Sequence, residues 1–306
     1  MLIPAQAGLQ MRLIHLTPLL LLAAFGCSSE KEAATTDVWE PFAGALADTQ
    51  RRNLTSEITG RTYQISVALP ENYAASNETY PVLYAVDANI QFGTVVETAR
   101  EQHQFGIVPE LIIVGIGYPV DRYAQSEELR RVDLTPTEDP GLLPDGSGGA
   151  PGFLDFIRRE LIPLIELEFR ADPTDRALFG HSLGGLFGLY ALFEGGGTFQ
   201  RVIAASPSIG WDDRVTFKME SAYSESHESL PATLYLSSGL LEDDEEWGES
   251  ASNVRELATI LEARNYAGLQ IKTAYFEDET HITVIPATIS RGLRTIYEGF
   301  PAAASE

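Results

Sequence analysis

Gly180-His181-Ser182-Leu183-Gly184-Gly185 sets a serine among glycines, between a short apolar run that ends at Phe179 and an apolar, aromatic stretch from Leu183 to Phe193. The run before the serine has the length of a strand, and the stretch after it has the length of a helix. A strand-to-helix turn this tight leaves no room for side chains on either side of the serine, which explains the glycines. The sequence therefore predicts a nucleophile elbow, with Ser182 exposed above the end of a strand and the first amides of the next helix facing any oxyanion that forms there.

Length and charge narrow the class of protein. The 306 residues, 44% of them apolar, are enough for a large buried core. We find no sign of a second domain and no internal repeat, and we expect one domain over residues 38–300. Forty-four acidic residues against twenty-one basic ones give a net charge of −23. This charge argues against nucleic acid or an anionic membrane surface as a partner and favours a highly solvated exterior.

The N-terminus has the pattern of an export signal. Residues 1–26 combine a charged start at Met11-Arg12 with an apolar core that is too short to span a bilayer. The single cysteine, Cys27, follows Ala24-Phe25-Gly26, which resembles the lipobox of bacterial lipoproteins although Phe25 replaces the usual small residue. We expect cleavage and acylation at Cys27, with simple secretion as the alternative.

The flanking segments fit that expectation. Residues 27–37 are small, polar and charged, as a tether is, and residues 301–306 form a short tail. The sequence thus predicts an exported lipoprotein of the periplasm or outer membrane, whose contact with the membrane is the lipid anchor alone.

Strands and helices alternate through the domain. An antiparallel hairpin is expected between Gln50 and Leu69, and the apolar runs Pro81–Asp87 and Leu111–Ile116 are typical of strands buried on both faces. Further strands are expected at 202–205, 232–238 and 269–275, and helices at 94–104, 154–167, 183–193, 253–264 and from about 283. This order predicts an α/β fold, with a mostly parallel sheet, helices on both faces and an N-terminal antiparallel hairpin.

A serine hydroxyl needs a base, and the carboxyl ends of parallel strands are where such groups gather. His281 alone among the histidines follows the last strand, where the order serine, acid, histidine places the base. His181 adjoins Ser182 but is expected to point away from it. The acid is expected within the run 242–246, with Glu242, nearest the strand end, ranked first and Asp244 second.

The oxyanion would need two amide donors. The first is expected from Leu183, directly after the nucleophile. The second is expected from Ala88 or Asn89, because Asp87-Ala88-Asn89 leaves the third strand where such an amide is required; a routine polar turn is the alternative.

With these residues in place, the chain resembles the esterase group of the α/β-hydrolases, and within it the siderophore (enterobactin-type) trilactone esterases. The likeness runs from about Arg61 to Tyr297. It rests on Leu83–Asp87, Val114–Pro119, Arg130–Pro136, Gly180–Gly185, Ser206-Pro207-Ser208 and His281–Pro286. Arg130–Pro136, interpreted as a loop, and the Ser-Pro-Ser turn point to this branch. The family's usual Asp-Gly after the third strand is Asp87-Ala88 here.

The resemblance implies hydrolysis of a small-molecule ester through an acyl-serine, without a metal or organic cofactor. It also implies that Arg130 and Arg131 meet an anionic substrate group such as a catecholate, unless they belong to an ion-pair network with Asp133 or nearby glutamates. A chain at −23 does not obviously attract a trianionic ferric chelate. An acyltransferase of the same fold and a catalytically inactive binding protein remain alternatives, and the substrate and oligomeric state stay open.

Overall fold

The computed structural model describes residues 40–41, 46–139, 141, 146–244 and 248–300. The predicted signal peptide (1–26), tether (27–37) and tail (301–306) lie outside these residues. The described residues belong to one compact unit. None of their helices combines the length and the hydropathy that a bilayer span requires.

Nine strands of the described residues form one sheet, in the order β1-β2-β3-β5-β4-β6-β7-β8-β11. The strands are β1 (Glu40–Pro41), β2 (Thr49–Thr55), β3 (Thr62–Ala68), β4 (Tyr80–Ala85), β5 (Ile112–Gly117), β6 (Ala171–His181), β7 (Arg201–Ala205), β8 (Ser229–Gly239) and β11 (Ala267–Phe276). From β5 to β11 all neighbours pair parallel, whereas β1, β2 and β3 pair antiparallel. The N-terminal hairpin and the mostly parallel sheet are confirmed.

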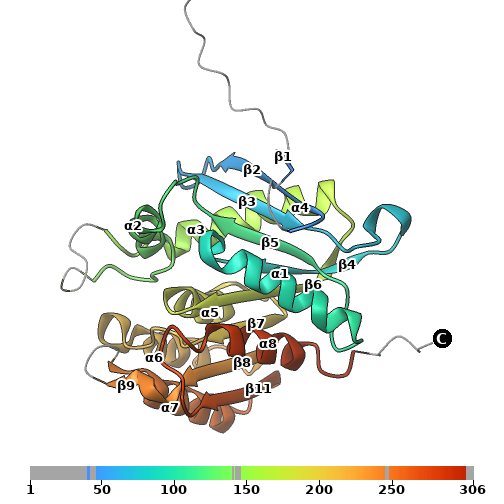
Figure 1. Cartoon of the computed structure of the whole chain (residues 1–306). Coiled ribbons are helices and arrows are strands. Elements are labelled where there is room, and N and C mark those ends of the chain that lie inside the picture. Colours follow the sequence, from blue (N-terminus) through green and yellow to red (C-terminus); the bar gives the residue numbers. More distant parts are fainter. Residues whose placement is uncertain (1–39, 42–45, 140, 142–145, 245–247, 301–306) are drawn as a thin grey trace, which may run out of the picture. The chain divides into compact units, whose positions relative to one another are not determined.

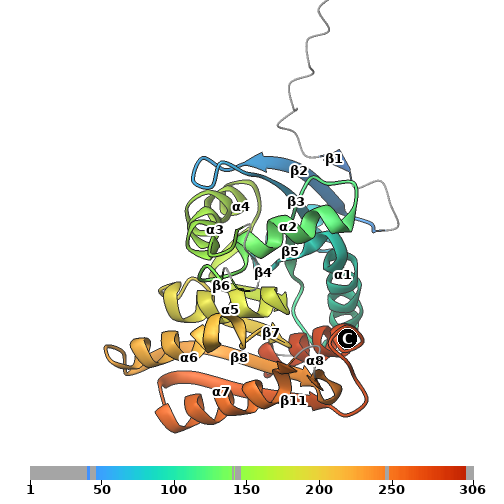
Figure 2. The same cartoon turned by 90° about the vertical axis from the view of Figure 1, so that its left-hand side faces the viewer.

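Helices cover both faces of this sheet, as predicted. Figures 1 and 2 show α1 and α8 together on one face, and α3, α4, α5, α6 and α7 on the other. The helices are α1 (Ala88–Gln104), α2 (Tyr123–Asp133), α3 (Ala150–Phe156), α4 (Ile162–Glu168), α5 (Leu183–Glu194), α6 (Trp211–Ser224), α7 (Ser250–Arg264) and α8 (Ile285–Ile296). Short elements are the 3₁₀ turns η1 (Tyr73–Ala75) and η3 (Leu240–Glu242), the π-helical turn η2 (Ile157–Leu161) and the strand pair β9 (Asp243–Asp244) and β10 (Gly248–Glu249).

Side chains alternate along the strands, so a separate hydrophobic core forms on each face of the sheet. On the α1/α8 face, Val95 and Leu293 pack against strand residues such as Phe179. On the opposite face, Phe187 and Leu257 pack with the other set of strand residues. Because successive strand residues point to opposite faces and both faces are covered, the central strands are apolar throughout, which explains the continuous apolar runs.

One prediction about local structure is wrong, and two of the expected helices are irregular. The helix expected over 154–167, in which Pro163 indicated a kink or a nearby start, is divided into α3, η2 and α4. Pro163 lies in the first turn of α4 and lacks the amide that a continuous helix needs. The stretch from Arg130, interpreted as a loop, begins inside a helix: Arg130 to Asp133 form the last turn of α2. Helix α6 lies between β7 and β8, where a helical stretch was expected without bounds, and Asp212 to Arg214 near its start have φ of 44° to 60°, outside regular helix geometry.

The strand order reverses beside β4. This strand lies between β5 and β6, so the chain leaves β4 on one side and returns on the other. In open parallel sheets such a reversal separates the loops at the carboxyl ends and creates a crevice for a ligand. Asp87 follows β4 and Ser182 follows β6, so the predicted nucleophile lies at this crevice.

Candidate active site

Ser182 occupies a strained turn between β6 and α5. Its φ and ψ are 61° and −121°, a conformation that an ordinary L-residue avoids. The turn is held on both sides, since the Ser182 amide donates to Ala205 O (3.0 Å) and the Ser208 amide donates to Ser182 O (3.1 Å). A Cβ on Gly180 would lie 2.0 Å from the carbonyl oxygen of Gly184, so glycine is obligatory there. The local geometry is that of a nucleophile elbow.

His281 lies in the loop between β11 and α8. Its Nδ1 is 2.8 Å from Oε2 of Glu242, and 6% of its side chain is exposed. A carboxylate only accepts hydrogen bonds, so Nδ1 carries the proton and Nε2 keeps the lone pair of a base. His281 and Ser182 line the same cavity, of about 500 Å³.

Glu242 is the residue of the acidic run that meets the histidine. The residue is fully buried, and its Oε1 accepts from Ser206 Oγ (2.6 Å) and from the Gly239 amide (2.6 Å). Its Oε2 accepts from Ser250 Oγ (3.0 Å) as well as from His281. Burial alone would raise the pKa of Glu242, but the hydrogen bonds from His281, Ser206 and Gly239 outweigh it and hold the pKa below its usual value. Glu242 is therefore an ionised, fixed acceptor at neutral pH.

Local sequence explains how Glu242 reaches this place. Gly239 ends β8, and the 3₁₀ turn η3 folds Glu242 back onto the Gly239 amide. A Cβ on Gly239 would lie 2.2 Å from Glu279 O, so the absent side chain lets the loop that carries His281 pass close to the end of β8. The next residue of the run, Asp243, bonds Ser252 instead. The side chain of Asp244, the second candidate, and residues 245–246 lie outside the described part.

His181 contacts the loop of the predicted base. Its Nε2 lies 2.8 Å from the carbonyl oxygen of His281, and the two rings are 4.6 Å apart at 46°. Burial, and next the neighbouring His281, lower the pKa of His181 to about 3. His181 is therefore neutral at physiological pH.

The two predicted substrate arginines differ in their surroundings. Arg130 is buried and forms a two-pronged ion pair with Asp87, Nε to Oδ1 at 2.6 Å and Nη2 to Oδ2 at 2.7 Å. Glu127 lies 3.5 Å from its Nη1. Arg131 is exposed, and both arginines line the cavity of Ser182. Asp133, the partner expected in an ion-pair network, bonds Arg61 (2.5 Å) and Tyr118 (3.0 Å) instead.

The predicted oxyanion donors lie at two helix N-termini. Leu183 is the first residue of α5 and lines the cavity, and Ala88 and Asn89 are the first residues of α1. The first amides of a helix have no intrahelical acceptor, so they are available to an anion. Asn89 turns its side chain toward the end of β5, where it donates to Tyr118 O and accepts from the Tyr118 amide, both at 2.8 Å. Asp87, rather than Ala88 or Asn89, is the residue of this turn that lines the cavity.

The remaining wall of the cavity is mixed, since Gln91, Glu127 and Ser208 line it together with apolar side chains. Its apolar side chains are Ile90, Leu183, Trp211, Ile282 and Ile285. Ile90 and Ile282 are 46% and 59% exposed, so they stand at the mouth. On one side of the cavity, an ester carbonyl would meet the nucleophile and the amide donors. The groups attached to that carbonyl would meet the apolar side chains, with Arg131 nearby.

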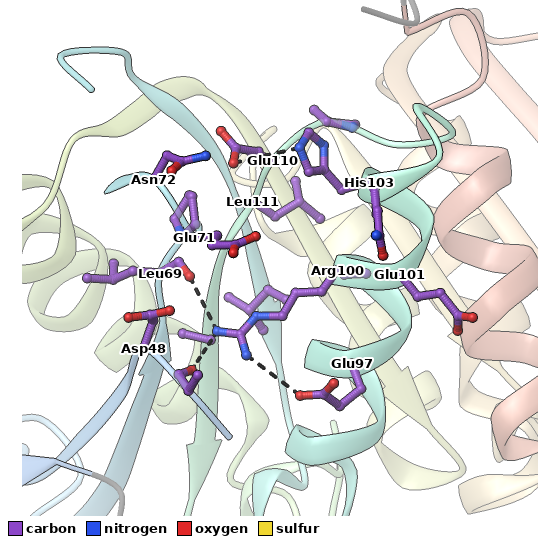
Figure 3. Close-up of a pocket in the computed structure, with 17 residues that line it drawn as sticks. Asp48, Leu69, Glu71, Asn72, Glu97, Arg100, Glu101, His103, Glu110 and Leu111 are labelled. Atoms are coloured by element: carbon purple, nitrogen blue, oxygen red, sulfur yellow. Dashed lines mark hydrogen bonds and ion pairs between the residues drawn. The ribbon is translucent and has the colours of Figure 1, made fainter. Parts of the chain in front are cut away.

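A larger cavity, of about 660 Å³, lies elsewhere, between the end of α1 and the loop after β3 (Figure 3). Arg100 reaches into it and donates to the carbonyls of Ala47 (2.7 Å) and Leu69 (3.4 Å), with Glu97 at 3.6 Å. The described residues that line it include no serine, threonine, cysteine or lysine. Size does not identify the site here, because the larger cavity offers no hydroxyl, thiol or lysine nucleophile among its described lining residues.

No group of three or more histidine, cysteine, aspartate or glutamate side chains is placed to hold a metal ion within the part of the chain that the structure describes.

The sequence did not predict every residue around the site. Ser206 and Ser250 hold Glu242, and Asp87 holds Arg130. Ser206 has a φ of 39°, an unusual value for serine. The Ser206-Pro207-Ser208 turn was recognised as a motif, but its hydrogen bond to the acid depends on a contact across 36 positions of the chain.

The sheet, its helices and the elbow define an α/β-hydrolase fold. The chain belongs to the esterase family whose model, described as "Putative esterase", matches residues 56–282. Ester hydrolysis is accordingly its class of reaction.

This chain is similar to several known esterases over most of their length. The ferri-bacillibactin esterase BesA of Bacillus subtilis is 35% identical over 265 residues, which are 82% of this chain and 90% of BesA. The siderophore triacetylfusarinine C esterase of Aspergillus fumigatus is 31% identical over 268 residues, 79% of this chain and 91% of that protein. The solved structure of an IroE-like serine hydrolase from Shewanella oneidensis superposes with a TM-score of 0.73 at 27% identity, covering 83% of this chain and 82% of that one.

Proposed function

We propose that the chain is a serine ester hydrolase that works through an acyl-serine intermediate. The observation that carries the proposal is the buried 2.8 Å hydrogen bond from His281 Nδ1 to Glu242 Oε2, made by a histidine that lines the same cavity as Ser182. The similarity to a structure described as a serine hydrolase supports it.

The reaction takes two half-steps. In the first, Ser182 Oγ attacks the carbonyl carbon while Nε2 of His281 accepts its proton, and Glu242 stabilises the resulting imidazolium. The oxyanion is held by the Leu183 amide and a second amide at the start of α1, from Ala88 or Asn89. When the tetrahedral intermediate collapses, His281 returns the proton to the leaving alcohol. Water then attacks the acyl-serine by the same route and releases the acid and Ser182.

We propose a siderophore-type ester, lactones included, as the substrate. The names of the Bacillus and Aspergillus relatives support this class, and they differ in the siderophore that they name. The open cavity of about 500 Å³ suits a bulky ester whose apolar part contacts Ile90 and Trp211.

Labelling with a fluorophosphonate tests the nucleophile. We expect one adduct on the peptide that contains Ser182, and none in the Ser182→Ala variant. Ser221→Ala, which removes an exposed serine from α6, is the matched control and should label as the wild type does. Persistent labelling of Ser182→Ala at the wild-type rate would refute the mechanism.

A panel of esters tests the substrate class. We expect turnover of siderophore esters above that of short acyl and feruloyl esters. The panel is repeated with an added acceptor alcohol, because an acyltransferase would transfer the acyl group in preference to hydrolysing it. Binding of a ferric siderophore without labelling or turnover would instead mark an inactive binding protein.

We also propose that the mature chain begins at Cys27 and is anchored in a bacterial membrane by its acyl chains, in the periplasm or at the outer membrane. The position of the cysteine between an apolar signal core and a polar tether supports this. Labelled palmitate should be incorporated by the wild type and not by Cys27→Ser. A wild type without label would indicate simple secretion.

A further inference from the structure

We infer that His181 is a positioning residue: its Nε2–H hydrogen bond to the main-chain carbonyl of His281 fixes the loop that carries the catalytic base. The inference rests on the proposed function, since it assigns a task within that same site. The sequence predicted only that His181 points away from Ser182, and it assigned no task to His181.

The contact joins the two halves of the predicted machinery directly. His181 is the last residue of β6, and the next residue is Ser182. His281 lies in the loop after β11, three strands away across the sheet. The 2.8 Å bond from His181 Nε2 to His281 O therefore ties the backbone of the base to the strand of the nucleophile. Glu242 fixes the imidazole of His281, and His181 fixes its main chain.

The direction of the hydrogen bond is determined by its acceptor. A carbonyl oxygen only accepts, so Nε2 of His181 carries a proton. The groups that face His181 are His281, Glu242 and Arg130, and burial together with the neighbouring imidazole lowers the pKa of His181 to about 3. His181 thus stays neutral when His281 takes up the serine proton, and it sets no positive charge 4.6 Å from the imidazolium.

The same contact limits the freedom of the base. The loop has its own bonds: the Val284 amide donates to Thr280 O (3.2 Å) across His281, and the Leu241 amide donates to Glu279 O (3.1 Å) just before it. Neither bond involves the carbonyl of His281. Without the donor at residue 181, we expect the peptide of His281 to move and Nε2 to lose its alignment with Ser182 Oγ. Misplacement of a catalytic group by about 1 Å can cost on the order of 100-fold in rate.

Three substitutions of His181 separate positioning from simple packing. His181→Gln keeps an amide N–H at a similar reach, His181→Met fills the space without a donor, and His181→Asn keeps a donor that is too short. We expect kcat to fall about 10- to 100-fold in the Met and Asn variants with KM nearly unchanged, and to recover in the Gln variant. The rate of fluorophosphonate labelling should fall by the same factor as kcat.

The three variants are compared at a temperature well below the lowest of their melting temperatures. If His181→Met does not fold, the Asn and Gln pair still decides. A Gln variant as slow as Asn, or Met and Asn variants as fast as the wild type, overturns the inference. Ser182→Ala is measured in parallel: if it remains active the proposed function fails, whereas an inactive Ser182→Ala with a fully active His181→Asn refutes only the role of His181.

Discussion

Removing one partner of the ion pair between Arg130 and Asp87 should be among the most destabilising single substitutions near the site. Both hydrogen bonds are short, at 2.6 and 2.7 Å, and only 10% and 5% of the two side chains are exposed. Replacing Arg130 with methionine leaves the Asp87 carboxylate buried without its main counter-charge. Breaking such a pair from one side costs about 3 to 5 kcal/mol, a large share of the roughly 5 to 15 kcal/mol that holds a domain together.

Denaturant unfolding followed by circular dichroism measures this loss. Arg131→Met is the matched control, because Arg131 is the next residue and is exposed; it should change the free energy of unfolding by no more than about 0.5 kcal/mol. The double variant Arg130→Met/Asp87→Asn removes both charges and should regain much of the stability lost in Arg130→Met. If Arg130→Met costs no more than Arg131→Met, an unpaired Asp87 carboxylate carries no penalty in the fold and the reasoning is wrong.

Four further predictions concern the site and the turn that carries Ser182. Ser182→Ala and His281→Ala should each lower kcat by about a million-fold, and the double variant by no more, because the two residues act as one unit; single-turnover hydrolysis measures this, and a multiplicative loss would contradict it. Glu242→Gln should reduce kcat less than these and Asp243→Asn should leave it unchanged. The pKa of folded Glu242 is lowered, so its contribution to stability is complete above a pH of about 4.3 and is lost as the pH falls through the folded pKa. The difference in unfolding free energy between wild type and Glu242→Gln should therefore shrink in acid. A difference that does not change with pH would contradict this prediction. Gly180→Ala should yield no soluble folded protein, since its Cβ would lie 2.0 Å from a backbone oxygen, and a normal melting curve would refute this.

The central strands β4, β5 and β7 were predictable because their apolar runs are continuous. Helix α2 was not, and its composition explains why. Its buried side chains are polar, namely Ser126, Arg130 and Asp133, so no apolar stripe marks the helix. Without an apolar stripe to reveal the helical period, the sequence also could not show that Arg130 is buried and Arg131 exposed.

Contacts between distant segments limited the prediction of the site. The order of serine, acid and histidine follows from the topology of the sheet, and Ser182, Glu242 and His281 were named on that ground. The partners that hold them were not. Asp87 meets Arg130 across 43 positions, and His181 meets His281 across 100. Such pairs arise from the packing of segments far apart in the chain, for which a single sequence carries no local signal.

Strand β11 lies at the end of the sheet, and this placement determines when during folding the catalytic residues can come together. Within the described sheet β11 pairs with β8 alone, and the loop that follows it carries His281. The elbow of Ser182 and the turn of Glu242 come earlier in the chain than His281, so they are synthesised first. The predicted catalytic residues are brought together only when the last strand is added to the sheet. Catalysis requires that β11 has been added to the sheet, and the onset of turnover during refolding would report when that step is complete.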